Sequence, residues 1–195
     1  MNTSQQRVVI LALLGMTLAV TRVHHFAAVP DASWAVFFVG GFYLSQWTRW
    51  AFPALMALAV LIDFIVIRGQ GIDFWSHYCV SPGYWALLPA HAALWGGGWW
   101  LQRHHGGIGW KALGLLAIVL PVSVAVCHLF AQGGFYWLSD SVANPTLAGW
   151  WKNYTDWLAP YLRVAAMYVA VAAMMHVALV QLGVLKDIGT HKQLP

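Results

Sequence analysis

The side chains best suited to chemistry gather in one short segment, residues 73–85, which reads DFWSHYCVSPGYW. The thiol of Cys79 lies there close to His77 and Asp73, among several aromatic side chains. Pro82 predicts a helix start directly after the thiol, and the positive end of a helix favours the thiolate form of a nearby cysteine. A thiolate binds soft metal centres, and aromatic neighbours suit a large flat ligand. The segment is therefore a candidate site for a flat, metal-containing ligand.

Cys127, the second of the two cysteines, leaves alternatives open. Both cysteines are predicted near the outer face of a membrane, where oxidising conditions allow a Cys79–Cys127 disulfide. Alternatively, Cys127 lies within an apolar helix pattern and packs there as a small hydrophobic residue with a buried thiol.

Polar side chains inside apolar segments are expensive to bury in lipid, so their positions are informative. Most of them fall near the ends of predicted spans on the same side as Cys79, whereas His91 and His176 lie deeper. Asp63 is expected to pair with Arg68 or Arg163. Each histidine taken alone is also explained by one hydrogen bond to a backbone carbonyl. Together these residues predict a polar cavity open to the outside, formed by Arg22, His24, His25, Asp63, His77, Cys79, Tyr84, Cys127, His128 and Arg163.

The composition places these residues in a membrane protein. Of the 195 residues, 61 % are hydrophobic, only 8 % are charged, and none is glutamate. A soluble domain needs far more charge on its surface. The formal charge of +4 comes from scattered Lys and Arg residues, which is typical of membrane-flanking positions and excludes a nucleic-acid patch. We expect a single transmembrane domain over residues 1–195.

Apolar runs of about 20 residues predict six membrane-spanning helices. The N-terminal run resembles a signal peptide, but its apolar character resumes after His25, so we interpret it as a retained first helix. The connection Ala131–Leu158 contains apolar and aromatic residues at helical spacing and predicts an amphipathic helix on the outer surface. The predicted spans are Val8–Val29, Ser33–Trp50, Pro53–Arg68, Pro82–Gln102, Trp110–Gln132 and Ala159–Lys186.

Lys and Arg are more frequent on the side that carries both termini, so the positive-inside rule places both termini in the cytoplasm. Tryptophans at the span ends fit the aromatic belt of a multi-pass protein. The sequence has no CxxC, GxSxG or HExxH motif and no phosphate-binding glycine loop. Active transport would therefore draw energy from a partner or a gradient.

The chain resembles the BtuM family, small bacterial inner-membrane proteins proposed to take up cobalamin. The similarity covers its size, its six predicted spans and, most specifically, the loop His77-Tyr78-Cys79-Val80-Ser81-Pro82-Gly83-Tyr84. The family is similar to the S-components of energy-coupling-factor transporters. The resemblance implies an S-component-like six-helix bundle in the bacterial inner membrane that works without the usual ATPase module, although a coupling ATPase stays possible.

The resemblance also implies that Cys79 binds the cobalt of the corrinoid axially and that Tyr84 lines the pocket. His77, Asp73 and Arg163 are further candidates for substrate contacts. We expect Cys79 to displace an upper ligand such as cyanide during capture; whether this exchange turns over catalytically stays open. Gly15 and Ala19 offer one small-residue pair for contact with a coupling subunit.

Two other functions are compatible with the same residues. A membrane haem or electron-transfer protein could use axial histidine pairs drawn from His24, His25, His91, His128 and His176. Alternatively, the chain is a small helper or assembly subunit that binds no ligand.

Overall fold

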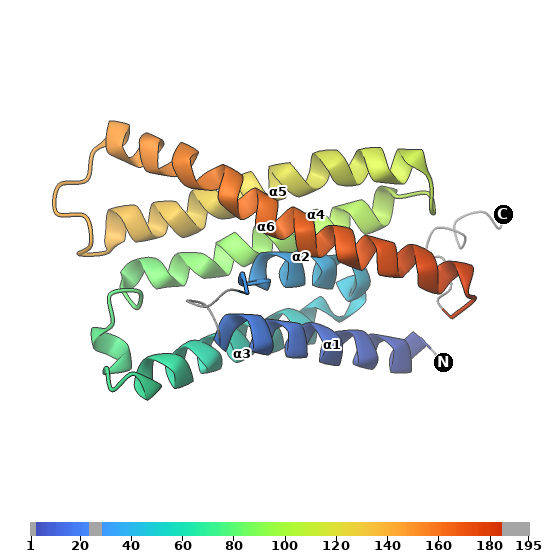
Figure 1. The fold of residues 1–195 in the computed structure, drawn as a ribbon, viewed down its shortest axis with the longest axis horizontal. Coiled ribbons are helices and arrows are strands. Elements are labelled where there is room, and N and C mark those ends of the chain that lie inside the picture. Colours follow the sequence, from blue (N-terminus) through green and yellow to red (C-terminus); the bar gives the residue numbers. More distant parts are fainter. Residues whose placement is uncertain (1–2, 24–28, 185–195) are drawn as a thin grey trace.

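The chain folds as a bundle of α-helices, in a computed structural model that describes residues 3–23 and 29–184 (Figure 1). The described α-helices are α1 (Thr3–Val23), α2 (Ser33–Tyr43), α3 (Thr48–Gly69), α4 (Leu87–His104), α5 (Trp110–Leu138) and α6 (Leu147–Gln181). Short 3-10 turns occupy Ser45–Trp47 (η1), Phe74–Ser76 (η2) and Pro82–Ala86 (η3). The prediction of an all-α chain is confirmed.

Among the residues that the structure describes, four segments are long and apolar enough to cross a membrane: Ser4–Val23, Ser45–Gly69, Trp110–Leu138 and Leu147–Gln181. Their outer faces carry large apolar side chains, among them Met16 on α1 and Met174 on α6, which are 58 % and 65 % exposed. Such faces suit lipid rather than water. The prediction of a multi-pass membrane protein is therefore confirmed, with four candidate spans instead of the predicted six. Of the other two helices, α2 is too short to cross a membrane and α4 is not among the four candidates.

The predicted span Ser33–Trp50 is wrong in its extent. The helix ends at Tyr43, and η1 then turns the chain into α3. Its 11 residues rise only about 16 Å, roughly half of a hydrocarbon core. Instead of crossing a bilayer, α2 lies at the centre of the bundle (Figure 1). Its Phe37 and Phe38 side chains are almost fully buried.

Glycines let α2 and α4 approach each other closely. A Cβ atom on Gly98 would overlap the carbonyl oxygen of Phe38, and one on Gly41 would overlap that of Trp95. Because these neighbours are backbone atoms, no side chain can move aside to make room. Helix packing thus explains Gly97, whose added Cβ atom would overlap the Ser123 side chain, and Gly98, whereas nothing lies within 4 Å of a Cβ atom added at Gly96.

The predicted surface helix within Ala131–Leu158 is also wrong. Instead, α5 continues to Leu138 and α6 begins at Leu147, after Thr146 accepts a hydrogen bond from the Gly149 amide (3.1 Å). The amphipathic pattern therefore belongs to the first turns of α6. This part of α6 packs on α5, where the Tyr154 hydroxyl donates to the Ala125 carbonyl (3.0 Å).

The start of α1 and the end of α6 lie at the same end of the bundle (Figure 1). The connection between α3 and α4, which carries Cys79, lies at the opposite end together with the α5–α6 connection. The start of α1 and the end of α6 are thus separated from the candidate site, as predicted.

Candidate functional site

A cavity of about 670 Å³ lies at the end of the bundle that holds Cys79. Because α2 begins at Ser33, well inside the bundle, the first turn of this helix forms part of the cavity wall through Trp34. The helices around it contribute both polar and aromatic side chains. The lining residues that carry polar atoms beyond the backbone include Arg22, Asp31, Asp63, His77, Tyr78, Cys79, Tyr84, His91, His128, Gln132, Asn153 and Tyr161.

Local hydrogen bonds fix the turn that holds Cys79. The Asp73 carboxylate accepts from the Trp75 amide (3.0 Å) and so starts η2. The Cys79 amide then donates to Nδ1 of His77 (3.2 Å), and the Val80 amide donates to the His77 carbonyl (2.8 Å). Cys79 is half-buried on the cavity wall as a result.

Contact with α5 holds the end of this loop in place. Gly83 in η3 is buried, and a Cβ atom at this position would overlap the carbonyl oxygen of Gly134 on α5. The two backbones therefore meet with no side chain between them, which fixes the loop relative to the bundle.

We expect Gly83→Ala to push η3 away from α5. The free energy of unfolding should fall by about 1–3 kcal/mol, as for other overpacked sites, and maleimide should label Cys79 several times faster. Gly69→Ala is the matched control, because nothing lies within 4 Å of its added Cβ atom. Equal labelling rates in the two variants would contradict this role of Gly83.

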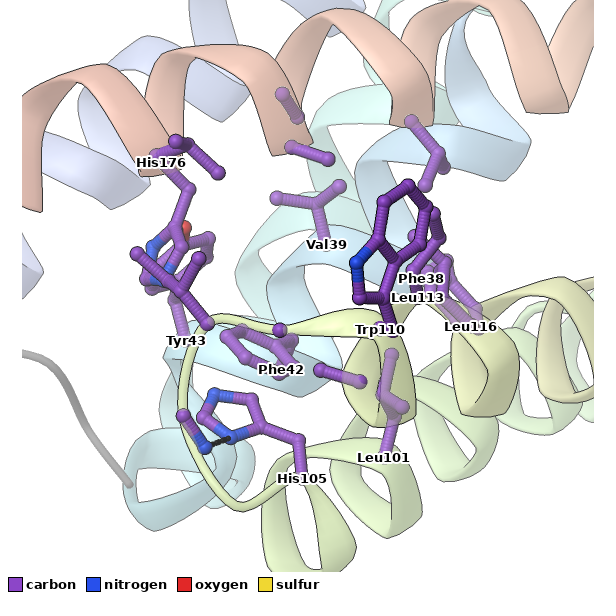
Figure 2. Close-up of a pocket in the computed structure, with 18 residues that line it drawn as sticks. Phe38, Val39, Phe42, Tyr43, Leu101, His105, Trp110, Leu113, Leu116 and His176 are labelled. Atoms are coloured by element: carbon purple, nitrogen blue, oxygen red, sulfur yellow. Dashed lines mark hydrogen bonds between the residues drawn. The ribbon is translucent and has the colours of Figure 1, made fainter. Parts of the chain in front are cut away.

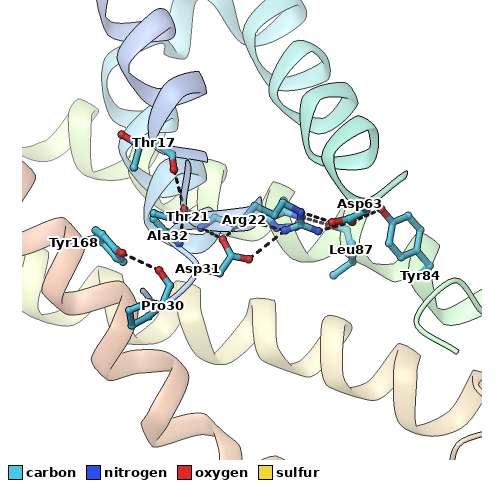
Figure 3. A network of polar contacts seen from close by, with 12 residues as sticks. Thr17, Thr21, Arg22, Pro30, Asp31, Ala32, Asp63, Tyr84, Leu87 and Tyr168 are labelled. Carbon is cyan, nitrogen blue, oxygen red and sulfur yellow. Dashed lines mark hydrogen bonds and ion pairs between the residues drawn. The ribbon is translucent and has the colours of Figure 1, made fainter. Parts of the chain in front are cut away.

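A buried charge network lines the cavity that also holds the thiol, and Figure 3 shows its side chains. The Arg22 guanidinium donates to both carboxylate oxygens of Asp63 (2.7 Å each) and to Asp31 (3.2 Å). The Tyr84 hydroxyl donates to Asp63 (2.6 Å). The side chains of Arg22, Asp31 and Asp63 are only 11 %, 18 % and 18 % exposed. The network joins α1, α3, η3 and the residues before α2.

The expected pairing of Asp63 with Arg68 or Arg163 is wrong. Arg68 instead pairs with Asp73 (3.2 Å) on the surface, where both side chains are more than half exposed. Arg163 is exposed on α6 and does not line the cavity. Asp63 pairs with Arg22 because α1, which carries Arg22, packs against α3, which carries Asp63.

The thiol itself is free, so the Cys79–Cys127 disulfide is ruled out in this structure. Burial raises the pKa of Cys79 above its ordinary value of 9.0, and the Asp63 charge adds to this, while a hydrogen bond with Tyr78 and the Arg22 charge oppose it. The raised pKa favours the protonated thiol at neutral pH, whereas the sequence predicted a thiolate at this position. The following helix, η3, has only five residues, too few for a strong dipole.

No known family model matches this chain, and no curated protein sequence matches it.

The predicted site residues divide into two groups. Cys79, Tyr84 and His77 line the cavity together, whereas Asp73 and Arg163 do not. Burial and the neighbouring Asp63 raise the pKa of Tyr84, so its hydroxyl keeps its proton and donates it in the hydrogen bond to Asp63. Asp73 shapes the loop rather than facing the cavity.

Trp34 and Tyr161, two aromatic residues of the cavity wall, were not predicted as site residues from the sequence. Trp34 stacks on Tyr161, with ring centroids 4.6 Å apart, and His128 packs against the same two rings. Gln132 lies one helical turn beyond His128 on α5 and lines the cavity too. The spacing of four residues between a histidine and a glutamine in an apolar helix was the available signal.

Of the histidines proposed for haem, the three that the structure describes do not gather at one place. His91 and His128 line the cavity that holds Cys79, while His24 and His25 lie outside the described residues. His176 lies at the other end of the bundle, where its Nδ1 atom and the Tyr43 hydroxyl are 2.6 Å apart.

His176 lines a second cavity of about 370 Å³, which is almost entirely apolar. Figure 2 shows Phe42 between His105 and Tyr43 at one side, and Trp110 with Leu116 at the other. The Nδ1 atom of His105 accepts from the Gly107 amide (3.0 Å), which shapes the α4–α5 connection. This cavity offers far fewer polar groups than the first.

Proposed function

We propose that this chain captures a corrinoid of the cobalamin class, with the Cys79 sulfur as an axial ligand of the cobalt. The observation that carries the proposal is the free, half-buried thiol on the wall of a polar cavity in a membrane helix bundle. A corrin ring holds cobalt through its own nitrogens and leaves only axial positions for the protein. One soft sulfur ligand is thus sufficient.

The charge of the cavity suits this ligand. Arg22, Asp31 and Asp63 are the charged lining residues and sum to −1 when the histidines are neutral. A corrin that holds Co(III) carries a net positive charge, because the ring itself is only a monoanion. The low exposure of the network strengthens this attraction relative to bulk water.

The size and the walls of the cavity also support the proposal. Its volume of about 670 Å³ is ordinary for a drug-sized ligand and suits one part of the corrin ring better than a whole cobalamin. The nucleotide tail would then extend from the mouth. The stacked Trp34 and Tyr161 rings offer a flat surface for the macrocycle.

The chemistry of capture is a ligand exchange. The Cys79 sulfur bonds to cobalt, the bond between cobalt and cyanide breaks, and the thiol proton joins the leaving cyanide to give hydrogen cyanide. The oxidation state of cobalt does not change, so no electron donor is needed. One exchange accompanies each captured molecule.

Two cobalamins test whether the thiol is protonated before it binds cobalt, because the pH dependence of their affinities should differ. With aquacobalamin, bond formation releases the thiol proton, so the apparent affinity should rise about tenfold per pH unit between roughly pH 6 and pH 7.5. The raised pKa of Cys79 keeps the free thiol protonated throughout this range. With cyanocobalamin, the leaving cyanide takes up the proton, and the affinity should hardly change.

The measurement is an absorbance titration of the detergent-purified protein, followed through the bands of the cobalt–sulfur complex. Prior alkylation of the half-buried Cys79 should abolish the change for both ligands, because the sulfur can no longer bond to cobalt. A flat pH profile with aquacobalamin would contradict coordination by this thiol.

In this proposal the cavity faces the periplasm of a bacterial inner membrane and both termini lie in the cytoplasm, as the positive-inside rule favours. Uptake would draw on a gradient or on a coupling ATPase. A Soret band without corrin bands in the purified protein would favour the haem alternative. Co-purification of a partner without any bound cofactor would favour a helper subunit.

A further inference from the structure

Two buried histidines on the cavity wall each have one ring nitrogen without a partner. His91 and His128 are 2 % and 1 % exposed, and both line the cavity that holds Cys79. Within the described part of the chain, no hydrogen-bond partner reaches Nε2 of His91 or Nδ1 of His128. Buried polar atoms are normally paired, so these two nitrogens need an explanation.

The other ring nitrogen of each histidine identifies the tautomer. Nδ1 of His91 lies 2.8 Å from the Leu87 carbonyl oxygen, and Nε2 of His128 lies 3.1 Å from that of Tyr154. A carbonyl oxygen only accepts, so each of these nitrogens carries the proton. A neutral ring then has a lone pair on the unpartnered nitrogen. Both histidines therefore carry an unpaired, buried hydrogen-bond acceptor on a residue that lines the cavity.

Gln132 adds a third unpaired group to the same lining. Both its amide nitrogen and its amide oxygen are buried without a partner among the described residues. The side chain lies one turn beyond His128 on α5 and offers one donor group and one acceptor. Three of the four unpaired atoms on these side chains are acceptors, so the hydrogen-bond partners that they need are mainly donors.

We infer that His91, His128 and Gln132 bind carboxamide groups of the ligand and discriminate against carboxylates. A carboxamide donates two hydrogen bonds through its NH₂ group and accepts through its oxygen. A carboxylate only accepts, so it would face two lone pairs in a cavity whose charged lining residues already sum to −1. The inference rests on the proposed function, because the corrin periphery carries several carboxamide side chains.

If only water molecules bound these atoms, the affinity would not depend on whether the ligand carries carboxamides or carboxylates. Buried waters commonly satisfy such atoms in an empty cavity, and a site filled by water has no reason to prefer one ligand periphery over another. The inference is thus about the identity of the groups that replace the water.

The test compares corrinoids that differ in a single group. Mild acid hydrolysis converts one carboxamide of cobinamide into a carboxylate and yields separable isomers. Each isomer is titrated against the wild-type protein by absorbance at neutral pH. We expect at least one isomer to bind about tenfold or more weakly than intact cobinamide, while others stay within about twofold.

His91→Leu and His128→Leu connect this loss to the two histidines. Each should weaken binding of intact cobinamide by about three- to tenfold and reduce the discrimination against the sensitive isomer. His104→Leu is the matched control, since His104 lies on the same helix and also binds the carbonyl four residues back (2.8 Å), but lies outside the cavity.

The outcomes separate the two proposals. Equal binding of every isomer to the wild-type protein overturns the inference, even if the histidine variants do not fold. Discrimination that is unchanged in both variants overturns the assignment to His91 and His128. The absence of any Cys79-dependent absorbance change with intact cobinamide overturns the proposed function itself.

Discussion

Cys79→Ala is expected to abolish the cobalt–sulfur absorbance bands and to weaken corrinoid binding by about a hundredfold or more. The reason is the loss of a direct bond to the metal, which the remaining cavity contacts do not replace. Cyanide should then stay on cobalt, because no thiol competes for its position. The measurement is an absorbance titration combined with detection of released cyanide.

Cys127→Ala is the control for general effects of losing a thiol. Cys127 is fully buried in α5 and does not line the cavity. Its replacement should keep the bands and the affinity, with only a modest loss of stability from the smaller side chain. Cobalt–sulfur bands that persist in Cys79→Ala and vanish in Cys127→Ala would reverse the assignment.

Arg22→Met is expected to lower the free energy of unfolding by about 3–5 kcal/mol, since removing one partner leaves buried charges uncompensated. Asp31 and Asp63 would lose their common cation at 18 % side-chain exposure each. Because the network joins α1 and α3, we expect the bundle to loosen at that contact. The midpoint of unfolding of the purified protein measures the loss.

Arg68→Met is the matched control, because Arg68 also pairs with an aspartate but is 55 % exposed. Exposed ion pairs contribute about 1 kcal/mol or less. Asp63→Asn should fall between the two variants, as it keeps Arg22 beside Asp31 (3.2 Å). Similar losses for the two arginine variants would show that burial of the network does not stabilise the bundle.

The long helices could be predicted because hydrophobic runs of membrane length have few other solutions. The end of α2 could not be predicted, since neither Gly nor Pro directly follows Tyr43 and aromatic residues continue past the break to Trp50. The early part of α6 was assigned to a separate helix for the opposite reason: polar residues such as Lys152 and Asp156 interrupt its apolar pattern. Periodicity alone does not distinguish these cases.

The part of the site that could be predicted consists of residues that are close together in the sequence. Cys79, His77 and Tyr84 are close in sequence, and a short loop keeps them together. The Arg22–Asp63 pair joins residues 41 positions apart and depends on the packing of α1 on α3, which local patterns do not contain. The raised pKa of Cys79 likewise depends on burial of the thiol in the folded bundle.

The short length of α2 has one more consequence. Its first turn contributes Trp34 to the large cavity, and its last turns contribute Phe38 and Tyr43 to the small one. A single short helix thus contributes to the walls of both cavities. A displacement of this helix would therefore change both cavities at once.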